Sequence, residues 1–202
     1  MQIRRTCGPG NRLPPERRRA VPGGSGAAVR IRPVREQDIR QFFQWQEEEP
    51  HWERYTCRPI QLLHDYQVFF TRYLQEIESG RQVVFCVEED GTVVGRMMAF
   101  DFNQRNASME IGYYLCAQAR HRDIGRRALA QWVEALFRWP HRELHKLYAT
   151  TSAENFGSAR ILERCGFQQD GRLREHYLLD GRWVDQLYFS LLRTEWLSAG
   201  GA

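Results

Sequence analysis

Several polar groups in the second half of the chain have residue types and spacings that could support chemistry. An arginine-rich turn, Arg120 to Arg126, precedes a helix-period pattern. The first backbone N–H groups of a helix have no intrahelical partner and lie at the positive end of its dipole, so this turn could bind an anion such as a phosphate. Asp123 lies in the turn and could cap the helix through its side chain. The same features would also fit an ordinary surface loop.

Glu110 lies in a strand-like apolar segment, Ser108 to Leu115, where a charged side chain needs a partner or a function. Alternate residues of a strand share a face, so we expect Glu110 and Tyr114 on one face and Tyr113 on the other. A primary amine with a pKa near ~10.4 is protonated at pH 7, and a carboxylate could take that proton. An ion pair or a position at the strand end would also explain Glu110 without chemistry.

A short capped helix is predicted from Asn155 to Phe167. Asn155 is a favourable N-cap residue, and Gly166 stands where a left-handed residue ends a helix. Between them a stripe repeats at helical spacing: Ser158, Ile161, Leu162 and Cys165. Ser158 is one turn from the cap, so it could serve in a capping box or take part in chemistry.

Strands and helices on either side of these groups must position them. Alternating or apolar runs predict strands, whereas apolar residues three or four apart predict helices. The expected strands are 29–32, 83–87, 92–102, 108–115, 147–151, 173–179 and 183–192, and the expected helices are 36–45, 61–78, 125–138 and 155–167. Hairpin signals at Asp90-Gly91 and Asp180-Gly181 join neighbouring strands. The order β-α-α-β-β-β-α-β-α-β-β favours one α/β domain with a mixed sheet and helices on both faces.

Composition indicates where the folded domain begins and ends, and it bears on nucleic-acid binding as a function. The 202 residues suffice for one domain, which we place at residues 29–197. A Pro-, Gly- and Arg-rich tail at 1–28 is expected to be disordered, and residues 198–202 form a short C-terminal tail. The net charge of +4 belongs to the N-terminal tail, because residues 1–29 carry +5 and leave −1 for the remainder. The domain therefore gives no argument for nucleic-acid binding.

The cysteines and the apolar segments indicate the cellular compartment, and the histidines indicate whether a metal cofactor is expected. Five scattered cysteines, an odd number, favour a reducing cytoplasm over a disulfide framework. No apolar run approaches the ~18 residues that span a membrane, and the start lacks the apolar core of a secretory signal. The six histidines form no paired ligand spacing, so we expect no metal.

The capped helix and the segments around it carry a family resemblance. The string Asn-Phe-Gly-Ser-Ala-Arg-Ile-Leu-Glu-Arg-Cys-Gly-Phe at residues 155–167 resembles the last helix of the core motif of the GNAT superfamily of N-acetyltransferases. A second pattern is similar to the ribosomal-protein-alanine N-acetyltransferase branch and consists of Arg174-Glu175, Asp180-Gly181, Asp185, Tyr188 and Glu195-Trp196. The resemblance covers about residues 29–196, and the predicted element order is the GNAT order.

The resemblance implies an N-acetyltransferase that uses acetyl-CoA as co-substrate and transfers the acetyl group directly in a ternary complex. The implied cofactor-binding residues are Leu115, Cys116, Arg120, Arg122, Asp123, Ile124, Gly125, Arg126, Asn155 and Ser158. The family turn reads Gln/Arg-x-x-Gly-x-Gly/Ala, so Asp123 replaces its first glycine and brings a negative charge near the phosphates. We therefore expect the Asp123 carboxylate to point outward, with neighbouring arginines offsetting its charge.

The resemblance also implies two catalytic residues. Glu110 occupies the strand position where many GNAT enzymes carry a base, and Ser158 would be the hydroxyl donor that helps the thiolate of coenzyme A depart. Many family members use a tyrosine as that donor, but Leu162 stands at its position. A catalytically silent acyl-CoA-binding module therefore stays open as an alternative.

The acceptor is the least determined part of this interpretation. In this fold the first helix-loop-helix segment walls the acceptor side, and here an acidic run, Glu47 to Glu49, lies between Trp45 and Trp52. Such side chains would suit a cationic amine through Coulomb attraction and ring-face contact. We assign substrate binding to Trp45, Glu48, Trp52 and Tyr114. A small cationic amine is slightly favoured over a protein N-terminus, and the chain is expected to act as a monomer or homodimer without nucleic acid or membrane.

Overall fold

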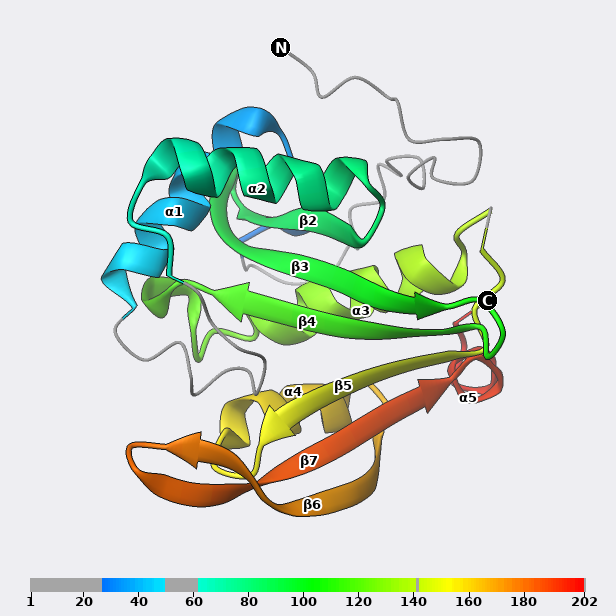
Figure 1. Cartoon of the computed structure of the whole chain (residues 1–202). Coiled ribbons are helices and arrows are strands. Elements are labelled where there is room, and N and C mark those ends of the chain that lie inside the picture. Colours follow the sequence, from blue (N-terminus) through cyan, green and yellow to red (C-terminus); the bar gives the residue numbers. More distant parts are fainter. Residues whose placement is uncertain (1–26, 50–61, 141, 202) are drawn as a thin grey trace.

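A seven-stranded sheet forms the centre of the domain, with strand order β1-β2-β3-β4-β5-β7-β6 (Figure 1). The computed structural model describes residues 27–49, 62–140 and 142–201. The strands are β1 Val29–Pro33, β2 Gln82–Glu89, β3 Thr92–Asn103, β4 Ser108–Leu115, β5 Lys146–Ser152, β6 Gln168–Leu179 and β7 Arg182–Leu192. Neighbouring strands are antiparallel except β4 and β5, which are parallel. The predicted mixed sheet is confirmed.

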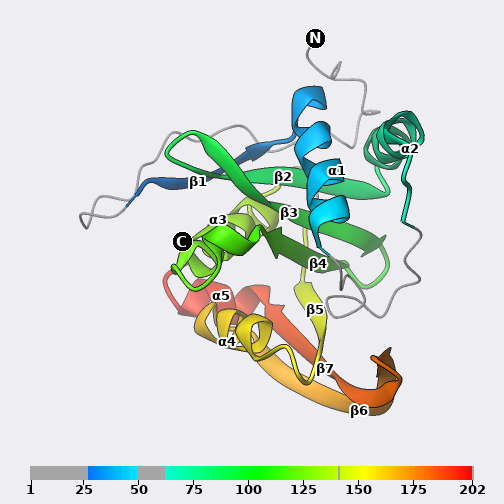
Figure 2. The ribbon, with the colours of Figure 1, turned by 90° about the vertical axis from the view of Figure 1, so that its left-hand side faces the viewer.

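Helices cover both faces of the sheet, as the sequence predicts. They are α1 Ile39–Glu48, α2 Tyr66–Glu78, α3 Ile124–Phe137, α4 Phe156–Arg164 and α5 Arg193–Ser198, with short 3₁₀ turns at Glu36–Asp38 and Ala117–Ala119. α1 and α2 lie on one face, whereas α3 and α4 lie on the other (Figure 2). No helix in the described ranges is long and apolar enough to cross a membrane.

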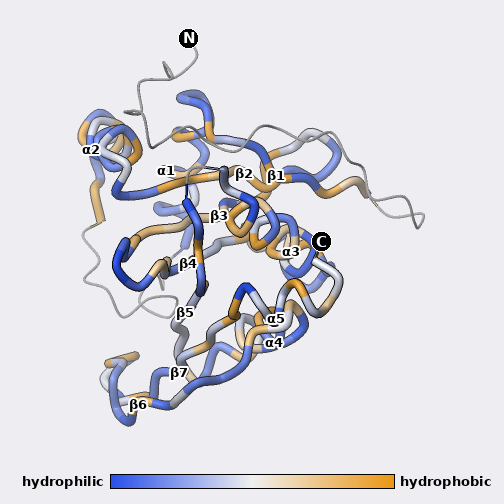
Figure 3. Tube along the Cα trace, turned by 90° about the vertical axis from the view of Figure 1, so that its right-hand side faces the viewer, coloured by the Kyte–Doolittle hydropathy of each residue, from blue (hydrophilic) through white to orange (hydrophobic). Residues whose placement is uncertain are grey.

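α3 supplies much of the core because its apolar residues recur three and four positions apart. Leu129, Trp132 and Leu136 are fully buried. The Trp132 indole N–H donates to the Met98 carbonyl of β3 at 3.2 Å, and its ring lies 4.8 Å from the Phe85 ring of β2. Burying one large apolar side chain stabilises a fold by roughly 1.5–3 kcal/mol. Figure 3 shows hydrophobic stretches in β2, β3 and α3.

β4 and β5 pair over only three residues and then diverge. Ser108 to Glu110 lie opposite Lys146 to Tyr148, and the parallel ladder ends there. Figure 1 shows the two strands separating toward their C-terminal ends. The rest of β4, from Ile111 to Leu115, keeps its pairing with β3 on the other side. Glu110 therefore stands at the point where the sheet opens.

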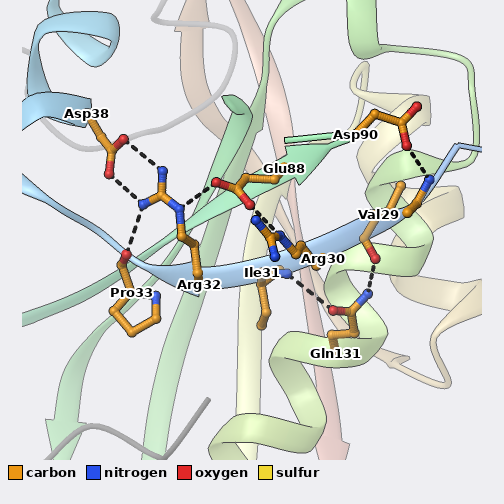
Figure 4. A network of polar contacts seen from close by, with 10 residues as sticks. Val29, Arg30, Ile31, Arg32, Pro33, Asp38, Glu88, Asp90 and Gln131 are labelled. Carbon is orange, nitrogen blue, oxygen red and sulfur yellow. Dashed lines mark hydrogen bonds and ion pairs between the residues drawn. The ribbon is translucent and has the colours of Figure 1, made fainter. Parts of the chain in front are cut away.

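Buried charges anchor β1 to its neighbours (Figure 4). Arg32 donates to Glu88 of β2 at 2.5 Å and to both carboxylate oxygens of Asp38 at 2.6 and 2.9 Å. Burial alone would raise the pKa of Asp38, but hydrogen bonds from Arg32 and from the Arg35 backbone outweigh it and hold that pKa below its ordinary value. This cluster ties β1 and β2 to the turn that leads into α1.

Several elements differ from the sequence prediction. α2 begins at Tyr66 rather than residue 61, because the Asp65 side chain caps it there. β6 begins at Gln168 rather than residue 173, since its first residues are exposed on an edge strand where no apolar alternation is needed. The sequence does not predict α5, whose Trp196 ring lies 5.3 Å from Phe137. Most of the predicted basic tail, residues 1–26, lies outside the described residues.

Candidate active site

The turn before α3 presents the start of a long helix beside the open part of the sheet. The first intrahelical hydrogen bond of α3 runs from the Arg127 N–H to the Asp123 carbonyl at 3.2 Å. The N–H groups of Ile124, Gly125 and Arg126 precede this bond, so helix geometry gives them no intrahelical partner. Together with the positive end of the helix dipole they form a potential anion site.

Asp123 does not cap α3 with its side chain, contrary to one sequence expectation. Its backbone is left-handed, with φ +59°, and its carboxylate forms a two-point ion pair with Arg126 at 2.7 and 2.8 Å. The hydrogen bond from Arg126 lowers the pKa of Asp123 below its ordinary value. Both side chains are about half exposed, so the carboxylate points outward and is neutralised locally.

Gly125 allows α3 to approach two other elements of the site closely. A Cβ atom at this position would lie 2.8 Å from Ile161 Cδ1 of α4 and 3.3 Å from Leu115 Cδ1 of β4. The first of these distances is shorter than real Cβ contacts, so a larger residue would require the end of the Ile161 side chain to move. The start of α3, the end of β4 and α4 therefore meet at Gly125.

The end of β4 is held by hydrogen bonds from two neighbours. Arg120 donates through Nε to the Leu115 carbonyl at 3.0 Å and through Nη2 to Glu49 at 2.7 Å. The Cys116 N–H donates to the Val94 carbonyl of β3 at 3.0 Å. Arg120 thereby links the end of β4 to the end of α1, which is a structural contact that the sequence does not reveal.

Arg122 also has a carboxylate partner within the protein. Its Nη2 lies 2.6 Å from Glu89 at the end of β2, and its side chain is about half exposed. Exposed ion pairs of this kind are typically worth about 0–1 kcal/mol, so an anionic ligand could compete with Glu89 for the guanidinium.

Glu110 is buried at the vertex between β4 and β5. Its side chain is among the few buried charged groups, with 9% of the residue exposed. The Thr150 hydroxyl of β5 donates to Glu110 Oε1 at 3.2 Å. Thr150 lies in the part of β5 that has already separated from β4. The carboxylate is thus held across the opening by a residue that the sequence analysis did not single out.

Asn155 and Ser158 lie at the start of α4, on the opposite face of β4 from Glu110. The Asn155 side chain accepts a hydrogen bond from the Ser158 N–H at 3.2 Å, which confirms the predicted N-cap. The Ser158 hydroxyl lies 2.7 Å from the Tyr113 hydroxyl, which also lies 3.2 Å from the Ser158 carbonyl. Burial raises the pKa of Tyr113. Strand alternation places Tyr113 on this face, but only the structure identifies Ser158 as its partner.

The residues expected to bind the acceptor lie beside Glu110 on the face covered by α1. Trp45 is only 4% exposed, and its ring lies 5.4 Å from that of Tyr114, which is 8% exposed. Both therefore pack in the core and leave little ring surface for a ligand. Glu48 is exposed at the end of α1, whereas Trp52 lies outside the described residues.

The structure thus gathers most of the predicted site around the opening of the sheet. Glu110 and Tyr114 approach it from one face, and Asn155 and Ser158 from the other, with the start of α3 beside the end of β4. In the part of the chain that the structure describes, no three His, Cys, Asp or Glu side chains lie close enough to hold a metal ion. The diverging parallel strands, the helix N-terminus beside them and the buried glutamate at the vertex together form the candidate site.

The chain belongs to the GNAT acetyltransferase family, because residues 28–168 match its acetyltransferase (GNAT) domain. GNAT enzymes use acetyl-CoA. One relative is YdaF of Bacillus subtilis (strain 168), which is named as a ribosomal N-acetyltransferase. It is 28% identical over 107 residues, which is 53% of this chain and 57% of that protein. The spermidine N(1)-acetyltransferase of Vibrio cholerae is 23% identical over 127 residues, 62% of this chain and 72% of that enzyme.

Two solved structures share this fold. Mycobacterium smegmatis RimJ, solved in complex with CoA-disulfide, has a TM-score of 0.69 and 25% identity, and the match covers 86% of this chain and 90% of RimJ. The Vibrio cholerae spermidine N-acetyltransferase in complex with CoA and spermine has a TM-score of 0.72 and 19% identity, covering 84% of this chain and 98% of that one. At that identity the second likeness concerns the fold alone.

Proposed function

We propose that this chain transfers an acetyl group from acetyl-CoA to a primary amine, directly and in a ternary complex. The observation that carries the proposal is the opening between β4 and β5, with Glu110 at its vertex and the start of α3 beside Leu115. From Glu110 to Leu115 a strand rises about 17 Å, at 3.3–3.4 Å per residue. This length lets the extended arm of coenzyme A run along β4 from the anion site to the glutamate.

The residues present fit the coenzyme. The N–H groups of Ile124, Gly125 and Arg126 would bind its diphosphate at the helix N-terminus, and Arg122 would add charge. Leu115 and Cys116 would border the arm at the end of β4. Asn155 would bind a polar group of the arm through its side-chain N–H₂, since its Oδ1 already accepts from Ser158. When bound, acetyl-CoA supplies the thioester carbonyl that the amine attacks.

Glu110 would act as the base that prepares the amine. At pH 7 a primary ammonium with pKa ~10.4 must lose a proton at a cost of about 4–5 kcal/mol before it can attack. Glu110 would take that proton directly or through one water, while the hydrogen bond from Thr150 orients the carboxylate. The amine nitrogen then bonds to the acetyl carbon, and the carbon–sulfur bond breaks to release thiolate. The Ser158 hydroxyl would stabilise that thiolate by hydrogen bonding.

The acceptor we favour is a small cationic amine such as a polyamine. Glu47 and Glu48 are exposed at the end of α1, on the face where Glu110 lies, and would attract a positive charge. Glu49 is engaged by Arg120 and contributes less. The second candidate is a protein N-terminus, which the similarity to YdaF of Bacillus subtilis, a relative named for ribosomal N-acetylation, favours. The local pairing of Asp123 with Arg126 weakens the argument for a silent coenzyme-binding module, because it neutralises the carboxylate near the phosphates.

An amine panel tests this proposal. The full chain would be incubated with acetyl-CoA and either polyamines, aminoglycosides or short peptides with an N-terminal alanine, while thiol release and acetylated product are measured. Thiol release with polyamines supports the favoured acceptor, and release with peptides alone would replace it by the second candidate. Coenzyme A binding without turnover on any amine would indicate the silent module. The cytoplasmic location and the monomeric or homodimeric state stay predictions.

A further inference from the structure

We propose that Tyr113 is a positioning residue for the departing thiolate, because it directs the Ser158 hydroxyl proton toward the opening between β4 and β5. The inference rests on the proposed acetyl transfer and adds a residue to it. Tyr113 lies on β4 within the stretch that no longer pairs with β5, and Ser158 lies in the first turn of α4. The two residues are 45 positions apart in sequence.

The geometry offers two hydrogen-bond arrangements for two hydroxyl protons. The Tyr113 oxygen lies 2.7 Å from Ser158 Oγ and 3.2 Å from the Ser158 carbonyl. If Tyr113 donates to the carbonyl, Ser158 donates to Tyr113, and both protons are used between the two residues. If Tyr113 donates to Ser158 Oγ, the Ser158 proton becomes free to point elsewhere. Only rotation of the two O–H bonds separates the arrangements.

A developing negative charge on sulfur would select the second arrangement. The thiolate accepts a hydrogen bond from Ser158, and the Tyr113 hydroxyl replaces the partner that Ser158 gives up. Hydrogen bonds in such a chain polarise one another, so the donation by Tyr113 strengthens the donation by Ser158. Tyr113 therefore acts on the leaving group through Ser158 and need not touch it.

Neither hydroxyl gives up its proton in this scheme. Burial raises the pKa of Tyr113, so its hydroxyl stays protonated and is a permanent donor. During the step a nitrogen–carbon bond forms, the carbon–sulfur bond breaks, and sulfur leaves with the electron pair. The ammonium loses two protons: Glu110 takes the first before the attack, and the second passes to water as the amide forms. The thiolate departs hydrogen-bonded to Ser158 and takes up one proton from water, so one proton is released overall. Protons and electrons balance without a tyrosinate.

The test compares Tyr113→Phe, Ser158→Ala and the double variant in steady-state turnover. Tyr113→Phe keeps the ring and its packing and removes only the hydroxyl, so we expect kcat to fall about 3- to 10-fold, the usual range for one hydrogen bond. KM for acetyl-CoA should stay unchanged. The double variant should be no slower than Ser158→Ala, since Tyr113 has no effect without Ser158. With an acetyl thioester of a more acidic pantetheine-type thiol, the deficit of Tyr113→Phe should shrink.

A matched control separates this role from a structural one. Tyr73→Phe removes another tyrosine hydroxyl, one that lies 3.3 Å from Arg96 on the opposite side of the sheet, and should leave kcat and its thiol dependence unchanged. Additive losses in the double variant, or a Tyr113→Phe deficit that is independent of thiol acidity, would overturn the inference. A wild-type chain that releases no thiol with any amine would instead refute the proposed function, before Tyr113 is tested.

Discussion

Two carboxylates of the site, Asp123 and Glu110, lie in contrasting surroundings. Asp123 is about half exposed, points outward and shares its charge with Arg126. Glu110 is buried at the vertex of the sheet and accepts a hydrogen bond from Thr150. The first arrangement allows a negative charge near the proposed phosphate site, and the second holds a carboxylate where we propose that an amine meets the thioester.

Replacing Asp123 by glycine should preserve or improve coenzyme binding. Glycine adopts the left-handed backbone of φ +59° without strain, and the change removes a negative charge and releases Arg126. We expect the Kd for coenzyme A, measured by calorimetry, to stay equal or to fall about 2- to 10-fold, because two like charges about 4 Å apart repel by about 1 kcal/mol in water.

Asp123→Ala is the matched control for the backbone. It removes the same charge but retains a Cβ in the left-handed region, so it should lower the free energy of unfolding by about 1 kcal/mol relative to the glycine variant. A large loss of coenzyme affinity in Asp123→Gly would mean that the Asp123–Arg126 ion pair itself builds the turn.

At the scale of elements, the buried cluster around Arg32 determines how β1 joins the domain. Arg32 lies between Asp38, before α1, and Glu88 of β2, while Glu88 also accepts from Arg30 at 2.5 Å. Burial opposes ionisation of Glu88, but the hydrogen bonds from Arg32 and Arg30 hold its pKa below the ordinary value. The cluster is therefore stable only while both carboxylates are charged.

Asp38→Asn should destabilise the domain by roughly 3–5 kcal/mol, because removing one partner leaves a buried charge only partly compensated. The pKa values of Asp38 and Glu88 are depressed in the folded state, so their stabilisation is present above the unfolded values near ~4 and is lost as the pH falls through the lower folded values. Chemical denaturation from pH 7 to pH 3 should accordingly show a shallower acid loss in Asp38→Asn. An unchanged free energy of unfolding at pH 7 would contradict this account.

Local signals in the sequence predicted most elements, whereas contacts between distant segments could not be read from it. Asn155 caps α4, and Gly166 is left-handed at φ +87°, because both features depend on a few neighbouring residues. The pairing of Tyr113 with Ser158 depends on how α4 crosses β4, and alternation along a strand specifies only a face. The partner of Arg120 was likewise hidden, since Glu49 is 71 residues away. The functional roles assigned to these residues stay predictions.

At the scale of the whole molecule, the two described residues before β1 both contact the domain. Ala28 N–H donates to the Asp90 side chain at 2.8 Å, and the Ala27 carbonyl accepts from Arg127 at 2.9 Å. Both contacts lie within the 1–28 segment that composition assigned to a tail. The boundary of the folded domain therefore lies two residues earlier than the sequence indicates.

Deleting residues 1–26 should leave the melting temperature and coenzyme affinity unchanged, because that segment has no apolar pattern with which to pack. Deleting 1–28 is the comparison and should lower the melting temperature by a few degrees, since it removes the two contacts of Ala27 and Ala28. Thermal unfolding of the two truncated chains checks both expectations. A clear drop in melting temperature or coenzyme affinity after removal of 1–26 alone would show that this segment docks on the domain.

The central claim is that Glu110 prepares an amine for attack on acetyl-CoA, and the turnover of Glu110→Gln across pH tests it most directly. Glutamine keeps the size and can still accept from Thr150, but it cannot take a proton. We predict that kcat falls by roughly 10²–10⁴ at pH 7 with acetyl-CoA affinity nearly intact. Part of the loss should be recovered toward pH 10, where solvent deprotonates the amine. Glu143→Gln, at a side chain 93% exposed, should behave as wild type. Full turnover of Glu110→Gln at every pH would contradict the account.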